Sequence, residues 1–165
     1  MNPRLETTHV KLVGVQGLVR LDQDPGVELG ELYGRLFGSL RQIPDIHRPY
    51  RTVGYWHFVA EKVRLYFAGI EVDSFSRFKW DAEKGLVAWD VGEATWAIWP
   101  EKNGEERTIT RGGICWDWLA TTEYSYDCRY IGDFEVYYWK TLGRVAKSAY
   151  HEVWLPVVAG KASAF

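Results

Sequence analysis

The chain has 165 residues, of which 47% are hydrophobic, enough for one well-packed domain and short for two independent ones. Lys and Arg number 20 against 22 Asp and Glu, giving a net charge of -2 without a dense basic block, so direct binding to nucleic acid or to an anionic membrane is not expected. Aromatic residues make up 16% of the chain, more than one small core needs, and the surplus is expected to line a pocket.

Signals for export and for metal binding are not evident. The chain starts with charged residues, and the short apolar run from Leu12 to Val19 contains Gln16, so the sequence predicts neither a signal peptide nor a membrane span. Cys115 and Cys128 lack metal-ligand spacing and the density of a disulfide scaffold. Four scattered histidines are expected to have structural or surface roles: His9, His47, His57 and His151. We therefore expect a cytoplasmic protein with no metal and no cofactor.

The first third of the chain predicts a strand followed by a helix. Apolar residues between Thr8 and Val19 are typical of a strand, which the turn signals at 22–26 would end. Asp24 followed by Pro25 indicates a helix cap and a first helical residue. Helical spacing continues through Leu29, Leu32, Leu36 and Leu40. Three glycines four residues apart are expected to let this helix pack closely on a sheet: Gly30, Gly34 and Gly38.

The rest of the chain predicts further strands, a linker and a second helix. In chain order we expect an antiparallel strand pair at 50–59 and 65–72, a linker at 73–85, strands at 86–89 and 94–99, a loop at 100–105 and a helix at 107–120. The segment from Asp133 to Trp139 is rich in aromatic residues and contains no proline or glycine. It predicts a strand near the middle of the sheet.

A spacing of 83 residues relates the two halves of the chain. It connects Trp56 to Trp139, and it also connects Tyr55 to Tyr138, Val53 to Val136, Leu36 to Leu119, Val15 to Ile98, Ile70 to Val153 and Val72 to Leu155. The pattern predicts one domain over residues 1–165, built from two strand-helix-strand-strand repeats at about 8–72 and 86–157 around a pseudo-twofold axis. The alternative is chance agreement between two similarly patterned halves.

Alternation along the strands predicts two faces of the sheet. The face beneath the helices would hold Val53, Ile70, Val72, Val136, Val153 and Leu155. The other face would form a concave groove with Thr52, Gly54, Trp56, Phe67, Gly69, Glu71, Glu135, Tyr137, Trp139, Tyr150, Glu152 and Trp154. Within the groove, Glu71 and Glu152 are expected at the rim or in solvent, since several unpaired carboxylates in an apolar groove would be protonated or hydrated.

Glu135 is the candidate anion of this groove. An aromatic surface that holds one carboxylate is suited to an apolar cation. The alternative is that Glu135 faces solvent or pairs with Arg129 or Arg144. The predicted ligand-binding residues are Glu135, Tyr137, Trp139, Trp56, Phe67, Trp89 and Tyr150. The sequence contains no nucleophile elbow, phosphate loop or dinucleotide fingerprint, and no catalytic residue is predicted.

Several segments, in this order, resemble the GyrI-like effector-binding family. They are residues 65–72 (LYFAGIEV), 97–99 (AIW), 118–119 (WL), 134–137 (FEVY) and 153–157 (VWLPV). The family includes the drug-binding domains of multidrug-responsive regulators of the AraC and MerR types, gyrase inhibitory proteins and free-standing members, some carried on integron gene cassettes. The chain resembles the free-standing members because it has no helix-turn-helix.

The resemblance implies an α+β fold of duplicated βαββ modules, an antiparallel sheet with helices on one face, and a central groove for flat, lipophilic, often cationic molecules. The glutamate that often serves as the buried anion carries over onto Glu135, with Tyr137 as its strand neighbour. The chain departs from the family where Trp89 to Glu93 replace a small, proline-containing turn. A binding role in sensing or sequestration is favoured. The alternatives are a hydrolase of strained-ring natural products and a gyrase-inhibitor-like module whose groove receives a separate protein.

Overall fold

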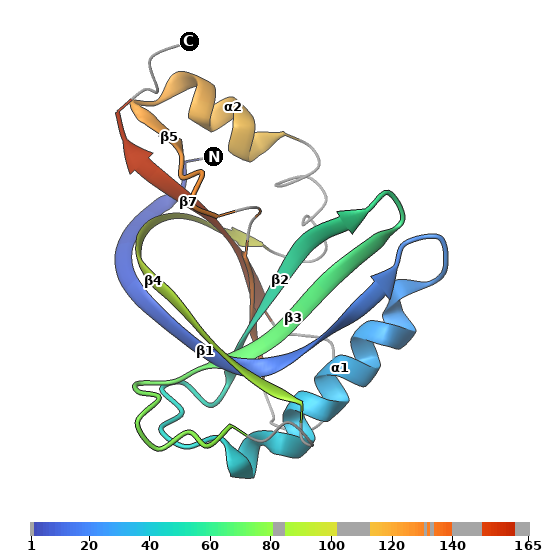
Figure 1. Ribbon diagram of the computed structural model, residues 1–165. Coiled ribbons are helices and arrows are strands. Elements are labelled where there is room, and N and C mark those ends of the chain that lie inside the picture. Colours follow the sequence, from blue (N-terminus) through green and yellow to red (C-terminus); the bar gives the residue numbers. More distant parts are fainter. Residues whose placement is uncertain are drawn as a thin grey trace.

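The computed structural model, which describes residues 2–80, 85–101, 113–130, 132, 134–139 and 150–160, has an α+β fold (Figure 1). Seven antiparallel strands and two α-helices are found within these ranges. In chain order the elements are β1 (Arg4–Arg20), α1 (Pro25–Ser39), the 3₁₀ turn η1 (Leu40–Gln42), β2 (Arg51–Ala60), β3 (Val63–Glu71), β4 (Leu86–Glu101), α2 (Ile114–Thr121), β5 (Tyr124–Tyr126), β6 (Phe134–Tyr138) and β7 (Tyr150–Ala159). In the described part of the chain, neither helix has the length and apolar composition needed to cross a membrane.

The sheet curls until its two sides meet. Its strand order is β4-β1-β3-β2-β6-β7-β5, and β4 also pairs with β7, so six strands form a ring with β5 outside it. We call the enclosed side the inner face and the opposite side the outer face. Both α-helices lie outside the curl in Figure 1. The two strands predicted at 86–89 and 94–99 are one long strand, β4, which pairs with β1 along most of its length and with β7 at its end.

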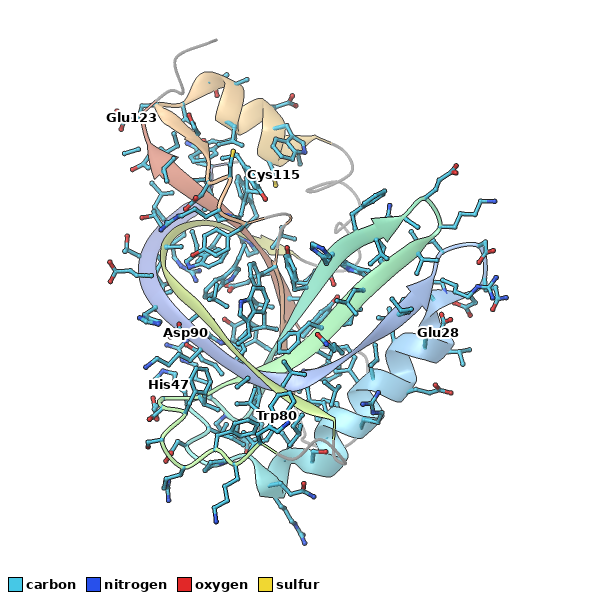
Figure 2. All side chains as sticks on the ribbon, in the orientation of Figure 1. Glu28, His47, Trp80, Asp90, Cys115 and Glu123 are labelled. Carbon is cyan, nitrogen blue, oxygen red and sulfur yellow. The ribbon has the colours of Figure 1, made fainter. Side chains whose placement is uncertain are left out.

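Both faces of the sheet are covered, so several strands bury consecutive residues. In β1, Leu12 lies in the inner cluster while Val13 and Val15 pack beneath α1. The inner cluster draws residues from all six strands of the ring, including Phe67, Trp96 and Trp154. Figure 2 shows side chains filling the space that the curled sheet encloses.

Helix α1 begins as the sequence predicts. The Asp24 side chain accepts a hydrogen bond from the Gly26 N–H at 2.9 Å, and Pro25 occupies the first helical position. The helix buries Leu32, Tyr33 and Leu36 against the sheet. The expected close approach through three glycines is wrong, because a Cβ atom on Gly30, Gly34 or Gly38 would meet nothing within 4 Å. These glycines lie on the open side of the helix.

Helix α2 covers the outer side of β4 and β7. Its residues Cys115, Trp118 and Leu119 pack against Trp99 and Val153. The helix was predicted at 107–120, and residues 107–112 lie outside the described part of the chain. In the described part, α2 begins after Gly113, whose φ of 86° is in the left-handed region that suits glycine.

The strand pairing follows the 83-residue spacing in most of the sheet. Val53 pairs with Val136 where β2 meets β6. Val53 pairs with Gly69, and the equivalent residues Val136 and Glu152 pair in the same way. The first strand of each half departs from the spacing. Leu12 pairs with Glu71, and Ile98 pairs with Trp154, which is the equivalent of Glu71 in the second half. The structural equivalent of Ile98 is therefore Leu12 and not Val15.

The predicted faces of the sheet are wrong for about half of their residues. Thr52 pairs with Ile70, and Val53 pairs with Gly69, so Val53 and Ile70 point to opposite faces. Ile70 and Val72 lie beneath α1, and Val153 and Leu155 lie beneath α2, as predicted. Val53 and Val136 belong to the inner cluster instead. A shift of one residue in the assumed pairing of β2 with β3 is enough to exchange the faces.

Candidate binding site

An aromatic cluster fills the space between helix α1 and the outer face. Tyr33 from α1 contacts Tyr137 and Trp139 of the central strand region, with ring centroids 6.1 Å and 5.5 Å apart. Phe37, one turn further along the helix, meets Trp139 edge-on at 5.2 Å. Trp56 packs beside this cluster, and its ring centroid lies 4.5 Å from that of Tyr66, a buried residue of β3. The rings come from the helix and from three segments of the sheet.

Glu135 lies within this cluster, on β6. One carboxylate oxygen accepts a hydrogen bond from the indole Nε1 of Trp56 at 3.1 Å, and the other accepts one from the hydroxyl of Tyr137 at 2.8 Å. The Glu135 side chain is half-buried. Strand pairing places it opposite Gly54 of β2, which brings the donor Trp56 to the same face. Two aromatic side chains therefore orient one carboxylate.

Two buried tyrosines connect helix α1 to strand β3 beside the site. The hydroxyls of Tyr33 and Tyr66 lie 3.0 Å apart and share a hydrogen bond. Burial, followed by the proximity of Tyr33 and of the Glu135 charge, raises the pKa of Tyr66 well above its ordinary value. The Tyr66 phenol is therefore neutral near neutral pH. Gly54 makes room for it, because a Cβ at position 54 would collide with the Tyr66 hydroxyl.

The site offers an anion and many ring surfaces. Hydrogen bonds from an indole N–H and a phenol O–H favour the charged form of a carboxylate. The faces of aromatic rings attract cations, and their bodies give apolar contact. Trp139 is itself held in place, since its Nε1 donates to the Thr52 hydroxyl at 2.7 Å. These features suit a lipophilic molecule that carries a positive charge.

The structure brings together four of the seven predicted ligand-binding residues. Trp56, Glu135, Tyr137 and Trp139 gather at the outer face, beneath α1. Phe67 and Trp89 lie on the inner face, so their predicted place in the same site is wrong. For the seventh, Tyr150, the structure describes the backbone, which pairs with Tyr138, while its side chain lies outside the description.

Sequence reasoning missed the contribution of the helix. Tyr33 and Phe37 reach the site from α1, and Tyr66 supports it from β3. The available signal was the spacing of Tyr33 and Phe37, which are four residues apart and therefore on one side of a helix. The sequence predicts the site on the face away from the helices, where Tyr33 and Phe37 would not reach it.

Glu71 and Glu152 are not the rim or solvated charges that were expected, because both are buried on the inner face. The Glu71 carboxylate is paired with the guanidinium of Arg51, which is also buried. The Glu152 carboxylate accepts hydrogen bonds from Arg4 at 3.2 Å, from the Tyr138 hydroxyl at 3.0 Å and from the Trp154 indole at 2.8 Å. Each of these carboxylates is bonded to an arginine.

Two of the histidines form exposed pairs with aspartates. His9 Nε2 lies 2.6 Å from Asp90, and His47 Nδ1 lies 2.6 Å from Asp73. His47 and Asp90 point outward from the surface in Figure 2. Within the described residues, no group of His, Cys, Asp and Glu has an arrangement that could hold a metal ion.

Comparison with known proteins finds similarity in structure. No family model and no curated protein matches the chain. SAV2435 bound to tetraphenylphosphonium matches with a TM-score of 0.57 and 11% identity over 96% of this chain and 94% of that one. A putative bacterial transcription regulation protein from Staphylococcus aureus MU50 matches with a TM-score of 0.53 and 12% identity over 95% and 98% of the two chains. A hydrolase from Listeria innocua matches with a TM-score of 0.51 and 14% identity over 95% and 93%. These similarities show that the chain shares the α+β fold of these proteins.

Proposed function

We propose that the protein binds flat, lipophilic cations at the site around Glu135, and that it serves to sense or sequester them. The observation that carries the proposal is the Glu135 carboxylate held by Trp56 and Tyr137 inside an aromatic cluster. A cation in this position would meet the carboxylate and several ring surfaces together. The tetraphenylphosphonium bound to SAV2435, which has the same fold, supports the proposal.

The expected energies are large enough to give selectivity for charge. A cation over an aromatic face gains about 0.5–1 kcal/mol at an exposed site and about 2 kcal/mol when water is excluded. Coulomb attraction between a carboxylate and a cation about 4 Å away is about 1 kcal/mol in bulk water and about 4 kcal/mol at the effective dielectric constant near a protein surface. The apolar rings supply the remaining affinity without regard to charge. Charge selectivity should therefore depend on Glu135, and overall affinity on the rings.

Hydrolysis is a second candidate function, favoured by the Listeria innocua neighbour that is described as a hydrolase. In that case Glu135 would hold or activate a water molecule as a general base. The two functions differ in whether the ligand is recovered unchanged. Incubating the protein with a bound compound and analysing it by mass spectrometry separates binding from turnover. A cytoplasmic location and a separate protein partner stay predictions from the sequence.

The test compares two lipophilic aryl-phosphorus probes that differ in charge. Tetraphenylphosphonium is the cation, and triphenylphosphine oxide is the neutral compound. Glu135→Gln keeps the size of the side chain and removes its charge, so affinity for the cation should fall by about 1–3 kcal/mol. Affinity for the neutral probe should stay the same or rise. Calorimetric titrations at two salt concentrations give both values.

Two control variants make the result specific. Glu123→Gln removes the same charge at an exposed position, marked at the surface in Figure 2, and should leave both affinities unchanged. Tyr137→Ala should lower the affinity for both probes, because it removes contact area as well as a hydrogen-bond donor to Glu135. If Glu135→Gln leaves the cation affinity unchanged, or weakens both probes alike, the carboxylate does not select the ligand and the proposal fails.

A further inference from the structure

A cavity lies on the inner face of the sheet, away from Glu135. Its volume is about 250 Å³, and it is formed between β1, β2, β3 and β4. Residues that line it include Gln16, Tyr55, Leu65, Phe67, Val87 and Trp89. The Trp89 ring stands 5.1 Å from the Tyr55 ring and meets the Phe67 ring edge-on at 5.6 Å. Three aromatic rings thus meet at one cavity.

The wall of this cavity is preformed by paired strands. Gln16 pairs with Phe67, Phe67 with Tyr55, and Leu12 with Trp89, so backbone hydrogen bonds fix the strands that carry the rings. Phe67 is buried, and its ring lies over Gly69, where a Cβ would collide with it. Tyr55 and Trp89 are half-buried, which leaves part of each ring accessible. A ligand would enter without disrupting the sheet.

The described lining of the cavity carries no fixed charge. Of the described residues that line the cavity, none is Asp, Glu, Lys or Arg. The polar side chains present are Gln16, Tyr55 and His57, at least partly exposed. An ion would lose hydration here without meeting an opposite charge, and that loss is costly. A neutral aromatic molecule would lose little hydration free energy and would gain contacts with the rings.

The volume limits the size of the ligand. A dry apolar cavity of about 150 Å³ in another protein binds benzene, whereas pockets for drug-sized molecules occupy about 300–1,000 Å³. The present cavity falls between these values. Its size suits one ring or two fused rings.

The cavity and the Glu135 site lie on opposite sides of the same strand. Alternation along β2 directs Tyr55 to the inner face and Trp56 to the outer face. We propose that the inner cavity is a second ligand site, which takes a small, neutral, flat aromatic molecule independently of the cation site. The proposal goes beyond cation binding and does not depend on it, since neither the described lining residues nor the expected ligand carries a charge.

Indole is a suitable probe because it is neutral and consists of two fused rings. In protein with ¹³C-labelled methyl groups, indole should shift the resonances of Leu65 and Val87 in a saturable way. The same shifts should appear in Glu135→Gln and in wild type saturated with tetraphenylphosphonium, because the two sites are separate. This measurement needs no change in the cavity itself.

Two variants then test the cavity directly. Val87→Phe fills the space and should abolish the saturable shift of Leu65, whereas Val27→Phe, at an exposed position of α1, should not. Trp89→Leu should lower the affinity for indole by about fivefold or more, because a stacking ring is lost. It should leave the affinity for tetraphenylphosphonium unchanged. The proposal is overturned if indole leaves Leu65 and Val87 unshifted, or if tetraphenylphosphonium displaces it.

Discussion

The two faces of the sheet hold their carboxylates in different ways. On the inner face, Glu71 is bonded to Arg51 and Glu152 to Arg4, so each anion meets an arginine of the fold. On the outer face, Glu135 accepts hydrogen bonds from the indole of Trp56 and from the phenol of Tyr137, which are neutral donors. Aromatic donors therefore help to orient Glu135, whereas arginines hold the two carboxylates of the inner face.

The faces also differ in what covers them. The inner face is enclosed by six strands joined through backbone hydrogen bonds, and the cavity lined by Tyr55, Phe67 and Trp89 is preformed between four of them. The outer face near Glu135 is covered by α1, which is held by the packing of one side of the helix. Moving a helix costs side-chain contacts and leaves the sheet intact. A ligand at the outer face would therefore displace helix contacts, whereas a ligand at the inner cavity would enter a preformed space.

The largest effect is expected from Arg51→Met on the inner face. It leaves the buried Glu71 carboxylate without its guanidinium, and breaking such a pair costs about 3–5 kcal/mol of unfolding free energy. Arg77→Met, which removes an exposed arginine paired with Asp45, should change stability little. Urea unfolding measures both. A double variant that adds Glu71→Gln should recover part of the loss, and equal losses for Arg51→Met and Arg77→Met would contradict the description of the inner face.

Tyr66→Phe probes the outer face. At neutral pH it removes the hydrogen bond with Tyr33 and should cost about 0.5–1.5 kcal/mol. In wild type the folded-state pKa of Tyr66 is raised, mainly by burial, so the stability from its neutral phenol is present below the ordinary tyrosine pKa and is lost as the pH rises above it.

The variant should lack this alkaline loss. Urea midpoints measured below and above the ordinary tyrosine pKa of about 10 show whether the difference in stability between wild type and Tyr66→Phe becomes smaller as the pH rises. Tyr50→Phe, at an exposed position, is the matched control and should follow wild type. A gap that stays constant with pH would mean that burial does not hold the Tyr66 proton.

The smallest effect, and one of opposite sign, is expected from Gly34→Ala on the open side of α1. A Cβ there meets nothing, and alanine favours the helix, so stability should rise by about 0.4–1 kcal/mol. Gly54→Ala is the contrasting variant, because its Cβ would collide with the Tyr66 hydroxyl and should destabilise the protein. Thermal melts show whether each variant is more or less stable than wild type. Destabilisation by Gly34→Ala would mean that this side of α1 does contact the rest of the molecule.

Much of the architecture could be predicted from local patterns. Helical leucine spacing and the Asp24 cap located α1, and alternation in β6 put Glu135, Tyr137 and Trp139 on one face. Trp56 was connected to them through the 83-residue spacing, and it does reach Glu135. Each of these inferences depends on residues close in sequence or on a repeat of the whole pattern.

The pairing between strands could not be predicted in the same way. Nothing local indicates that Val53 pairs with Gly69 and not with Ile70, yet this choice decides which face lies beneath α1. The buried state of Glu71 and Glu152 was also missed, because their arginines, Arg51 and Arg4, are distant in the sequence. Ring closure by β4 and β7 likewise depends on long-range pairing.

The position of a bound cation can be measured directly. We expect intermolecular nuclear Overhauser effects between the phenyl protons of tetraphenylphosphonium and the rings of Tyr33, Tyr137 and Trp139, in wild type, with these signals lost or much weaker in Glu135→Gln. That result would place the cation at the outer face beside its carboxylate. Effects to Phe67 and Trp89 instead, unchanged in Glu135→Gln, would contradict the assignment of cation binding to the outer face.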